Sequence, residues 1–500
     1  MSQVSPLEQS AFIDSADFPC ILDPIQQFFS SRGVTAFIVG GAVRDALLGR
    51  KTEDIDIAVQ ASIDDILELG EALANALNGS YVVLDRARGT VRIVLDDEQV
   101  LDISAAPDGL NEDLKRRDFT VNAMAVPLAE VAPGTSKVLV TDLSGGVDDL
   151  AAKVIRMASP SVFDEDAVRL MRGPRLAAQL GFSLSDDARI AIRRDAELLR
   201  QSSPERVRDE LLKLLAATDA MSSVSTLDDL RLLSIVIPEL DEARDVSQPK
   251  EHYWDVFNHS VETVGQVERI LGGQKETNDW VAGLVPTFPD MDSHFAERIS
   301  DGHSRLTLLK LVGLLHDIAK PTTKTIEETG RIRFFGHHEV GAEIVGEILD
   351  RLRVGMRGRQ FVKGLVRHHL RPNQMAEPGK LPTRRATYRY YRDLGDGAIS
   401  TLYLNMADYL AARGPLLKRD EWQKHCDLIA HILDGKFGKS SVTLVPKLIT
   451  GSEVIEEFSV EPGPLIGTLL EAVREAHAAG DISTRDDAIQ FVGQMLITKR

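Results

Sequence analysis

Cysteine is scarce in this chain of 500 residues, which contains only Cys20 and Cys426. Two cysteines cannot build a disulfide framework, and this indicates a reducing compartment. The chain also lacks an apolar run long enough to span a bilayer, and its first residues, Met-Ser-Gln-Val-Ser-Pro-Leu-Glu, lack the basic and apolar regions of a signal peptide. These absences predict a cytoplasmic protein that has no membrane partner.

An excess of positive charge is missing too, because the formal net charge is -18 and the pI is near 5.2. Taken alone, this charge argues against binding to nucleic acid. Residues 351–392 are nevertheless basic, with Glu377 as their single acid. This segment either meets an RNA backbone or forms a solvated basic surface, and the sequence leaves both open. Its basic residues are Arg351, Arg353, Arg357, Arg359, Lys363, Arg367, Arg371, Lys380, Arg384, Arg385, Arg389 and Arg392.

The most informative stretch is residues 37–59. Two glycines before a helix let a phosphate approach the free N–H groups at the positive end of the helix dipole. Arg44, in the first turn of that helix, adds a cation to such a phosphate pocket. The pattern predicts a strand, a tight Gly-Gly turn, a short helix ended by a glycine and a second strand, over residues 37–39, 40–41, 42–48 and 55–59.

Asp54 and Asp56 lie two residues apart on the second strand, so both carboxylates point to one face. Ile55 and Ile57 then point to the other face, toward a core. Paired carboxylates beside a phosphate pocket suit Mg²⁺, which takes oxygen ligands and bridges nucleotide phosphates. An isolated Asp-x-Asp is more often only a polar strand face, so the glycine motif upstream decides in favour of a metal site.

Gly-Gly-x-x-Arg-Asp followed by Asp-x-Asp resembles the nucleotidyltransferase head of the class II family of CCA-adding tRNA nucleotidyltransferases and bacterial poly(A) polymerases. The resemblance implies that Gly40, Gly41 and Arg44 hold the triphosphate of ATP or CTP. It also implies that Asp54 and Asp56 hold the catalytic Mg²⁺ ions.

Further strands are predicted over residues 81–84, 90–95 and 100–104, after a helix over residues 63–77. The resembled family often places a third carboxylate on a neighbouring strand. Asp102 is the candidate for that position, and an ordinary solvent-facing aspartate is nearly as strong an interpretation.

Residues 116–125, Arg-Arg-Asp-Phe-Thr-Val-Asn-Ala-Met-Ala, match a second motif of the same family, Arg-Arg-Asp-Phe-Thr-x-Asn-Ala. The resemblance implies that Arg117 meets the nucleotide and that Asp118 and Asn122 orient the loop. Alone, a basic pair at the start of a helix would indicate little.

Residues 163–172 predict the start of a helix with acids in its first turn. Asp166, Arg169 and Arg172 are spaced by three and would share one face. A carboxylate acceptor beside a guanidinium donor matches the Watson–Crick edges of cytosine and adenine but not those of uracil and guanine. An exposed, salt-bridged helix face is the alternative.

The same segment resembles the Glu-Asp-x-x-Arg neck motif of the family, in its CCA-adding form, which implies that these side chains and Arg175 bind the nucleotide. Gly173-Pro174 departs from the family pattern. Proline disrupts a helix interior, so this dipeptide predicts a break and makes the role of Arg175 less secure.

Residues 241–435 carry a second group of histidines and aspartates: His259, His316-Asp317, His337-His338, His368-His369 and Asp408. The adjacent His-Asp pair, with further His and Asp on flanking helices, resembles the HD metal-dependent phosphohydrolase domain. Imidazoles and carboxylates that converge from several helices can hold one or two divalent ions, including transition metals. Within this region, residues 272–301 are rich in Gly, Pro and Asp, which predicts an insertion loop and is compatible with disorder. The implied metal ligands are His259, His316, Asp317, Asp408, His338 and His369.

The predicted fold is a mixed α/β head of the nucleotidyltransferase type followed by all-α domains. A length of 500 residues with 43% hydrophobic residues is enough for several cores. The expected parts are an N-terminal extension, the head, a helical neck for RNA and base recognition, the HD domain and a helical tail, over residues 1–35, 36–157, 158–240, 241–435 and 436–500.

The resemblance implies template-independent addition of CMP and AMP, from CTP and ATP, to the 3′ end of tRNA, together with an HD phosphohydrolase activity. A poly(A) polymerase or an enzyme that adds only CC or only A on the same fold is the nearest alternative. An HD phosphohydrolase with a regulatory, nucleotide-binding head is an alternative of a different class, against which the intact Asp54, Asp56 and Arg117 count.

Overall fold

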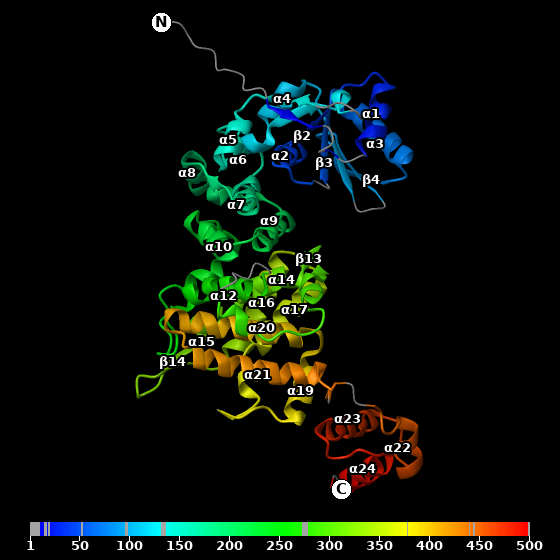
Figure 1. Ribbon diagram of the computed structural model, residues 1–500, viewed down its shortest axis with the longest axis vertical. Coiled ribbons are helices and arrows are strands. Elements are labelled where there is room, and N and C mark those ends of the chain that lie inside the picture. Colours follow the sequence, from blue (N-terminus) through cyan, green and yellow to red (C-terminus); the bar gives the residue numbers. More distant parts are fainter. Residues whose placement is uncertain are drawn as a thin grey trace. The chain divides into compact units, whose positions relative to one another are not determined.

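The computed structural model describes residues 11–14, 18, 21–51, 54–95, 99–131, 137–272, 279–377, 379–439, 441–443 and 446–498. The chain divides into two compact units, Met1–Ser202 with Leu230–Leu232, and Ser203–Asp229 with Leu233–Arg500. Many of their elements are labelled in Figure 1. The division at residue 202 lies inside the predicted neck, so the neck boundaries stay a prediction. Cys20 lies outside the described residues, and Cys426 is a buried free thiol.

A seven-stranded mixed sheet forms the centre of the first unit, which confirms the predicted fold class. Its strand order is β4-β5-β6-β3-β2-β7-β9, and β3 and β6 run parallel while the other neighbours are antiparallel. Figure 1 shows β2, β3 and β4 in the blue part of the chain. The strands are β2 (Ala36–Val39), β3 (Asp54–Val59), β4 (Ser80–Asp85), β5 (Thr90–Val94), β6 (Val100–Ala105), β7 (Met124–Pro127) and β9 (Thr141–Asp142).

Helix α3 (Ile63–Leu77) covers one face of this sheet at β4, β5 and β6, and its bounds match the prediction. The helix begins with a capping box, in which Ser62 accepts from the backbone N–H of Asp65 and the Asp65 side chain accepts in return. Its apolar side buries Ile66 and Leu73. Because α3 occupies this face, the opposite face of β3, β5 and β6 is left half-exposed for a site.

The glycine turn lies between β2 and helix α2 (Gly41–Leu47), within a residue or two of the predicted bounds. Gly40 has a φ of +73°, a conformation that favours glycine. Helix α1 (Leu22–Ser30) precedes β2 and buries Ile25 and Phe29.

The predicted continuous helix through Asp166 is wrong. Helix α6 (Val162–Glu165) ends before Asp166, whose φ of -158° and ψ of 99° are extended. Helix α7 (Arg169–Leu180) then continues through Pro174, so the predicted break at Gly173-Pro174 is wrong too. Both residues are buried, and a Cβ on Gly173 would lie 3.0 Å from Cζ of Phe119. This close packing outweighs the backbone hydrogen bond that proline forfeits.

The second unit is helical. Helices α12 (Val256–Leu271), α14 (Arg305–Leu315), α16 (His337–Arg351), α17 (Met356–His368) and α20 (Ala398–Arg413) pack against one another. Helix α20 is buried on nearly every side, which explains its lack of amphipathic patterning. No helix among the described residues is both long and apolar enough to cross a membrane.

Residues 279–301 form short helices and a strand, so the prediction of a loop is wrong for this part, while the prediction that the segment is an insertion stays a prediction. Residues 273–278 lie outside the described residues. The segment contains a short 3-10 helix (Ala282–Leu284), helix α13 (Met291–Ala296) and strand β12 (Arg298–Ser300). Phe295 and Ile299 are buried. Trp422 donates its Nε1 to the Val281 carbonyl at 3.0 Å, which ties the segment to the helical core.

The basic segment 351–392 is largely neutralised by ion pairs. On helix α19 (Arg384–Leu394), Arg389 pairs with Glu475 of helix α23 (Pro464–Ala479), so these charges attach the tail helices to α19. This pairing favours the interpretation as a structural surface over an RNA-binding patch. At least ten of the twelve basic side chains pair with carboxylates: Arg351, Arg357, Arg359, Lys363, Arg367, Arg371, Lys380, Arg385, Arg389 and Arg392.

Candidate active site and metal centre

A cavity of about 620 Å³ opens in the first unit beside the glycine turn. Most of the head and neck residues expected at a nucleotide site line it, whereas Arg44, Asp54, Asp102, Asp166 and Arg175 are not among its lining residues. The predicted residues that do line it are Gly40, Gly41, Asp56, Arg117, Asp118, Asn122, Arg169 and Arg172. Four further polar lining residues were not predicted from the sequence: Arg88, Asp113, Arg116 and Glu165.

Gly40 is the point where the glycine turn, the carboxylates and the second motif meet. A Cβ placed on Gly40 would lie 2.8 Å from Nη1 of Arg117 and 2.9 Å from Oδ2 of Asp56. The Nε of Arg117 donates to Asp113 at 3.0 Å, which fixes the guanidinium over the turn. The absence of a side chain at position 40 therefore makes room for a cation and a carboxylate side by side.

Three aspartates on two neighbouring inner strands form an acidic patch on one face of the sheet. Asp56 of β3 lies beside Asp102 of β6 in the register of the parallel pair, and Asp54 is exposed at the start of β3. Burial raises the pKa of Asp56, and the negative charges of Asp102 and Asp54 add to this, while Arg117 opposes it. Carboxylate oxygens are the ligands that a hard divalent cation prefers, so these donor atoms fit Mg²⁺.

Asp118 connects the second motif to helix α7. It accepts from Nη1 of Arg172 and from Nδ2 of Asn122, each at 3.0 Å. Burial opposes ionisation, but the Arg172 charge and these hydrogen bonds outweigh it and lower the pKa of Asp118 to about 2. Asn122 in turn accepts from Arg44 at 2.6 Å, and Arg44 also pairs with Asp45. Arg44 thus connects helix α2 to Asn122 and is not among the residues that line the cavity.

Arg169 lies where helix α7 meets the cavity. Its Nη2 donates to the Arg116 carbonyl at 2.9 Å, and its Nη1 donates to the Val162 carbonyl and to Glu165. The Nε atom of Arg169 is buried without a hydrogen-bond partner among the described residues. Arg175 lies further along α7 and donates to Gln179.

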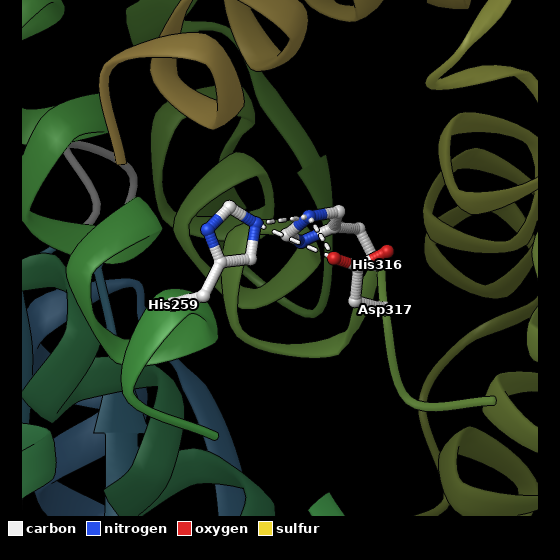
Figure 2. A group of neighbouring side chains, drawn as sticks. All are labelled: His259, His316 and Asp317. Carbon is white, nitrogen blue, oxygen red and sulfur yellow. Dashed lines mark hydrogen bonds and ion pairs between the residues drawn. The ribbon is translucent and has the colours of Figure 1, made fainter. Parts of the chain in front are cut away.

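The second unit brings histidines and aspartates from five helices to one buried place. His259 lies on α12, His316 and Asp317 directly follow α14, and Asp408 lies on α20. Figure 2 shows the first three side chains directed toward one another. The Nε2 of His259 is 3.2 Å from Nε2 of His316, 3.3 Å from Oδ2 of Asp317 and 3.1 Å from Oδ1 of Asp408.

Asp317 faces two groups of ligand atoms with its two oxygens. Its Oδ2 lies toward His259 and His316, and its Oδ1 lies 3.4 Å from Nε2 of His337 and 3.8 Å from Nε2 of His369. Both groups have the spacing of a metal site. An aspartate between two such groups can bridge two divalent ions.

Backbone carbonyls set the orientation of three of these imidazoles. The Nδ1 atoms of His316, His337 and His369 lie 2.7–2.9 Å from the carbonyl oxygens of residues 313, 334 and 366. An Nδ1–H that donates to a carbonyl leaves Nε2 as the lone-pair atom, and the Nε2 atoms are those that converge. The donor chemistry therefore fits a divalent metal, including a transition metal.

His338 was predicted as a ligand, but the structure places His337 in the cluster instead. His337 is the first residue of α16 and is buried, whereas the Nε2 of His338 lies 4.0 Å from Glu339. Successive residues of a helix point about 100° apart, so only one of the two faces the centre. The other expected ligands, His259, His316, Asp317, Asp408 and His369, come together.

Comparison with known proteins assigns the chain to a family. A model of the poly A polymerase head domain matches residues 36–156, a model of the probable RNA and SrmB-binding site of polymerase A matches residues 181–244, and an HD domain model matches residues 292–413. An A-adding tRNA nucleotidyltransferase of Deinococcus radiodurans is 34% identical over 91% of this chain and 94% of its own length. The chain belongs to the tRNA nucleotidyltransferase family with a poly(A) polymerase head.

A second relative agrees with this assignment, and a solved structure shares the fold. A CC-adding tRNA nucleotidyltransferase of Thermus thermophilus is 32% identical over 91% of this chain and 93% of its own length. The structure of a Thermotoga maritima CCA-adding enzyme complexed with tRNA shares the fold, with a TM-score of 0.58, 21% identity, and coverage of 97% of this chain and 99% of that one. The family and HD domains generally use divalent metals, and this chain has groups of residues suited to them.

In this family member, Gly40→Ala is expected to lower nucleotide addition about a hundredfold or more while the protein still folds. The added Cβ would meet Arg117 and Asp56 below 3.0 Å, and alanine disfavours the positive φ. Gly33→Ala is the matched control, because Gly33 also has a positive φ but no atom lies within 4 Å of its Cβ position. Equal losses of activity in the two variants would point to backbone strain alone.

Proposed function

We propose that this chain transfers CMP and AMP from CTP and ATP to the 3′ end of tRNA, without a nucleic-acid template, and releases pyrophosphate. The observation that carries the proposal is the cavity in which Asp56 and Arg117 meet across Gly40 and to which Arg169 and Arg172 of α7 contribute. The matching relatives are named for additions of this kind.

Each group in the cavity has a role suited to the transfer. Gly40 and Gly41 expose backbone N–H groups, and Arg117 supplies positive charge for the triphosphate. Asp54 and Asp56 would hold Mg²⁺, which lowers the cost of charge on the attacking and leaving oxygens. Asp118 and Asn122 hold Arg172 and Arg44 in place, so the protein contributes mainly positioning and fixed charge.

The proposal is tested by incubating the protein with tRNA that lacks its CCA end and with each nucleoside triphosphate singly and in mixtures. Addition of CMP twice and then AMP supports the full CCA reaction. The two relatives that match over nearly the whole chain are A-adding and CC-adding. Addition of only AMP to tRNA ending in CC, or of only two CMP, would assign the chain to one of those partial reactions, and a long AMP tract to poly(A) synthesis.

We expect Arg169→Ala to relax the choice of base more than it weakens triphosphate binding. Arg169 lines the cavity, its Nε has no partner among the described residues, and we assign the phosphate contacts to Arg117 and the glycine turn. The measurement is the ratio of CTP to UTP incorporation, which should be about tenfold lower in the variant because a hydrogen-bonded contact that rejects the wrong base is lost. Arg175→Ala is the control on the same helix, outside the cavity lining. Unchanged exclusion of UTP and GTP would place base selection elsewhere.

A second activity is proposed for the HD domain, the hydrolysis of a phosphoester at a divalent metal site. Its support is the pair of ligand groups that share Asp317, because a chain that needed only a scaffold would gain nothing from four converging imidazoles. The Nζ atom of Lys320 lies 2.6 Å from Oδ2 of Asp317 and adds positive charge beside the site. A tRNA-supporting scaffold is the alternative.

A further inference from the structure

Arg92 lies on β5, directly opposite Asp102 in the antiparallel pair of β5 and β6. Its Nε donates to Oδ1 of Asp102 at 2.8 Å, and its Nη2 donates to Oδ2 at 2.7 Å. Two parallel, charge-assisted hydrogen bonds make this a strong and geometrically specific pair. Both carboxylate oxygens of Asp102 therefore accept hydrogen bonds from the guanidinium of Arg92.

The pair belongs to a row of charges that crosses three strands. Asp102 has Arg92 opposite it on one side and Asp56 beside it on the other. Residues in register on neighbouring strands share a face and lie about 5 Å apart, so the order across the sheet is positive, negative, negative. The pKa of Arg92 is raised, first by its hydrogen bonds to Asp102 and also by the charges of Asp54 and Asp56, against the opposing effect of burial.

This arrangement limits what Asp102 can offer to a divalent cation. To become a metal ligand, Asp102 would have to give up two charge-assisted hydrogen bonds and bring the ion close to a guanidinium. Mg²⁺ bound to nucleotides typically uses one or two carboxylates together with phosphate oxygens. Asp54 and Asp56 already satisfy that number.

We propose that Arg92 keeps Asp102 out of the head's divalent-cation site, so that the nucleotide-free protein binds the ion weakly and the ion enters together with the triphosphate. The inference rests on the proposed role of Asp54 and Asp56 as metal ligands. Arg92 is then a positioning residue, which acts on the ion through Asp102 and does not touch the substrate. Its effect is greatest when no nucleotide is bound.

The test is Mn²⁺ binding without nucleotide, followed by the electron paramagnetic resonance signal of the free ion. The full-length protein carries Asp317→Asn throughout, so that binding in the HD domain is suppressed equally in all samples. Arg92→Met is expected to tighten Mn²⁺ binding about tenfold, because Asp102 is released and a positive charge is removed. Arg92→Met/Asp102→Asn, which removes both charges, is expected to bind within about twofold of the parent.

An unchanged affinity in a folded Arg92→Met protein would overturn the inference. Loss of affinity in the double variant would also overturn it, since Asp102 would then be a ligand in the parent. If Arg92→Met alone fails to fold, the double variant, which leaves no unpaired charge, still exposes the inference to refutation through a loss of affinity. Asp56→Asn distinguishes a failure of the proposed metal site from a failure of the role of Arg92. An unchanged Mn²⁺ affinity in Asp56→Asn would refute Asp56 as a metal ligand. A lower affinity in Asp56→Asn beside an unchanged affinity in Arg92→Met would refute only the role of Arg92.

Discussion

Asp56→Asn is expected to reduce nucleotide addition by about a thousandfold or more, with the fold retained, because it removes one of the two carboxylates that would hold the catalytic Mg²⁺. Asparagine keeps the shape of the side chain beside Gly40 and Arg117 but lacks its charge. The measurement is single-turnover incorporation of labelled CMP or AMP into tRNA that lacks its CCA end. Asp54→Asn should behave in the same way.

The matched control is Asp64→Asn, which removes a carboxylate from an exposed position in the first turn of α3, away from the cavity lining. It should add nucleotides at the parent rate, and the circular dichroism spectra of both variants should match that of the parent. Full incorporation by Asp56→Asn would refute the assignment of the acidic patch around Asp54 and Asp56 as the catalytic centre.

The head could be predicted closely from the sequence because its signals are local. The alternation of Asp54, Ile55, Asp56 and Ile57 defines a strand with one polar face, and Ser62 caps a helix whose apolar spacing runs to residue 77. Such patterns act within a few residues, so no knowledge of the tertiary contacts was needed.

The connections between distant residues could not be predicted in this way. Arg172 pairs with Asp118, 54 positions earlier, and Arg92 turns toward Asp102 on the next strand. Pro174 stays within a helix because Gly173 packs on Phe119, and this contact forms only after the chain has folded. In each case tertiary packing overrides the local preference.

The two adjacent histidines of α16 show the same limit at the metal centre. The choice between His337 and His338 depends on the residue at which the helix begins. Gly336, with a φ of +71°, precedes the first turn and directs His337 inward. Successive residues of a helix point in different directions, and the pair His-His contains no signal that tells which imidazole faces Asp317.

That difference provides a matched test of the HD domain. His337→Ala is expected to lower the content of bound divalent metal and phosphoesterase activity about a hundredfold, because it removes one of three ligand residues at the second group. His338→Ala, one position along the same helix, should leave both within about twofold of the parent. The assay uses Asp54→Ala protein, so that the head reaction does not contribute, with a cyclic nucleotide phosphodiester as substrate and Mg²⁺, Mn²⁺, Ni²⁺ and Co²⁺ tested in turn.

Asp317→Asn should have the largest effect, because its two oxygens serve both ligand groups and asparagine retains only one neutral acceptor oxygen. Loss of metal and of hydrolysis in this variant and in His337→Ala, beside an unaffected His338→Ala, would establish a working centre built as the structure places it. Absence of both metal and hydrolysis in the Asp54→Ala parent, with every ion, would leave the domain as a scaffold. Equal effects at His337 and His338 would contradict the placement of His337, since only one of these neighbours has its Nε2 within 3.4 Å of Asp317.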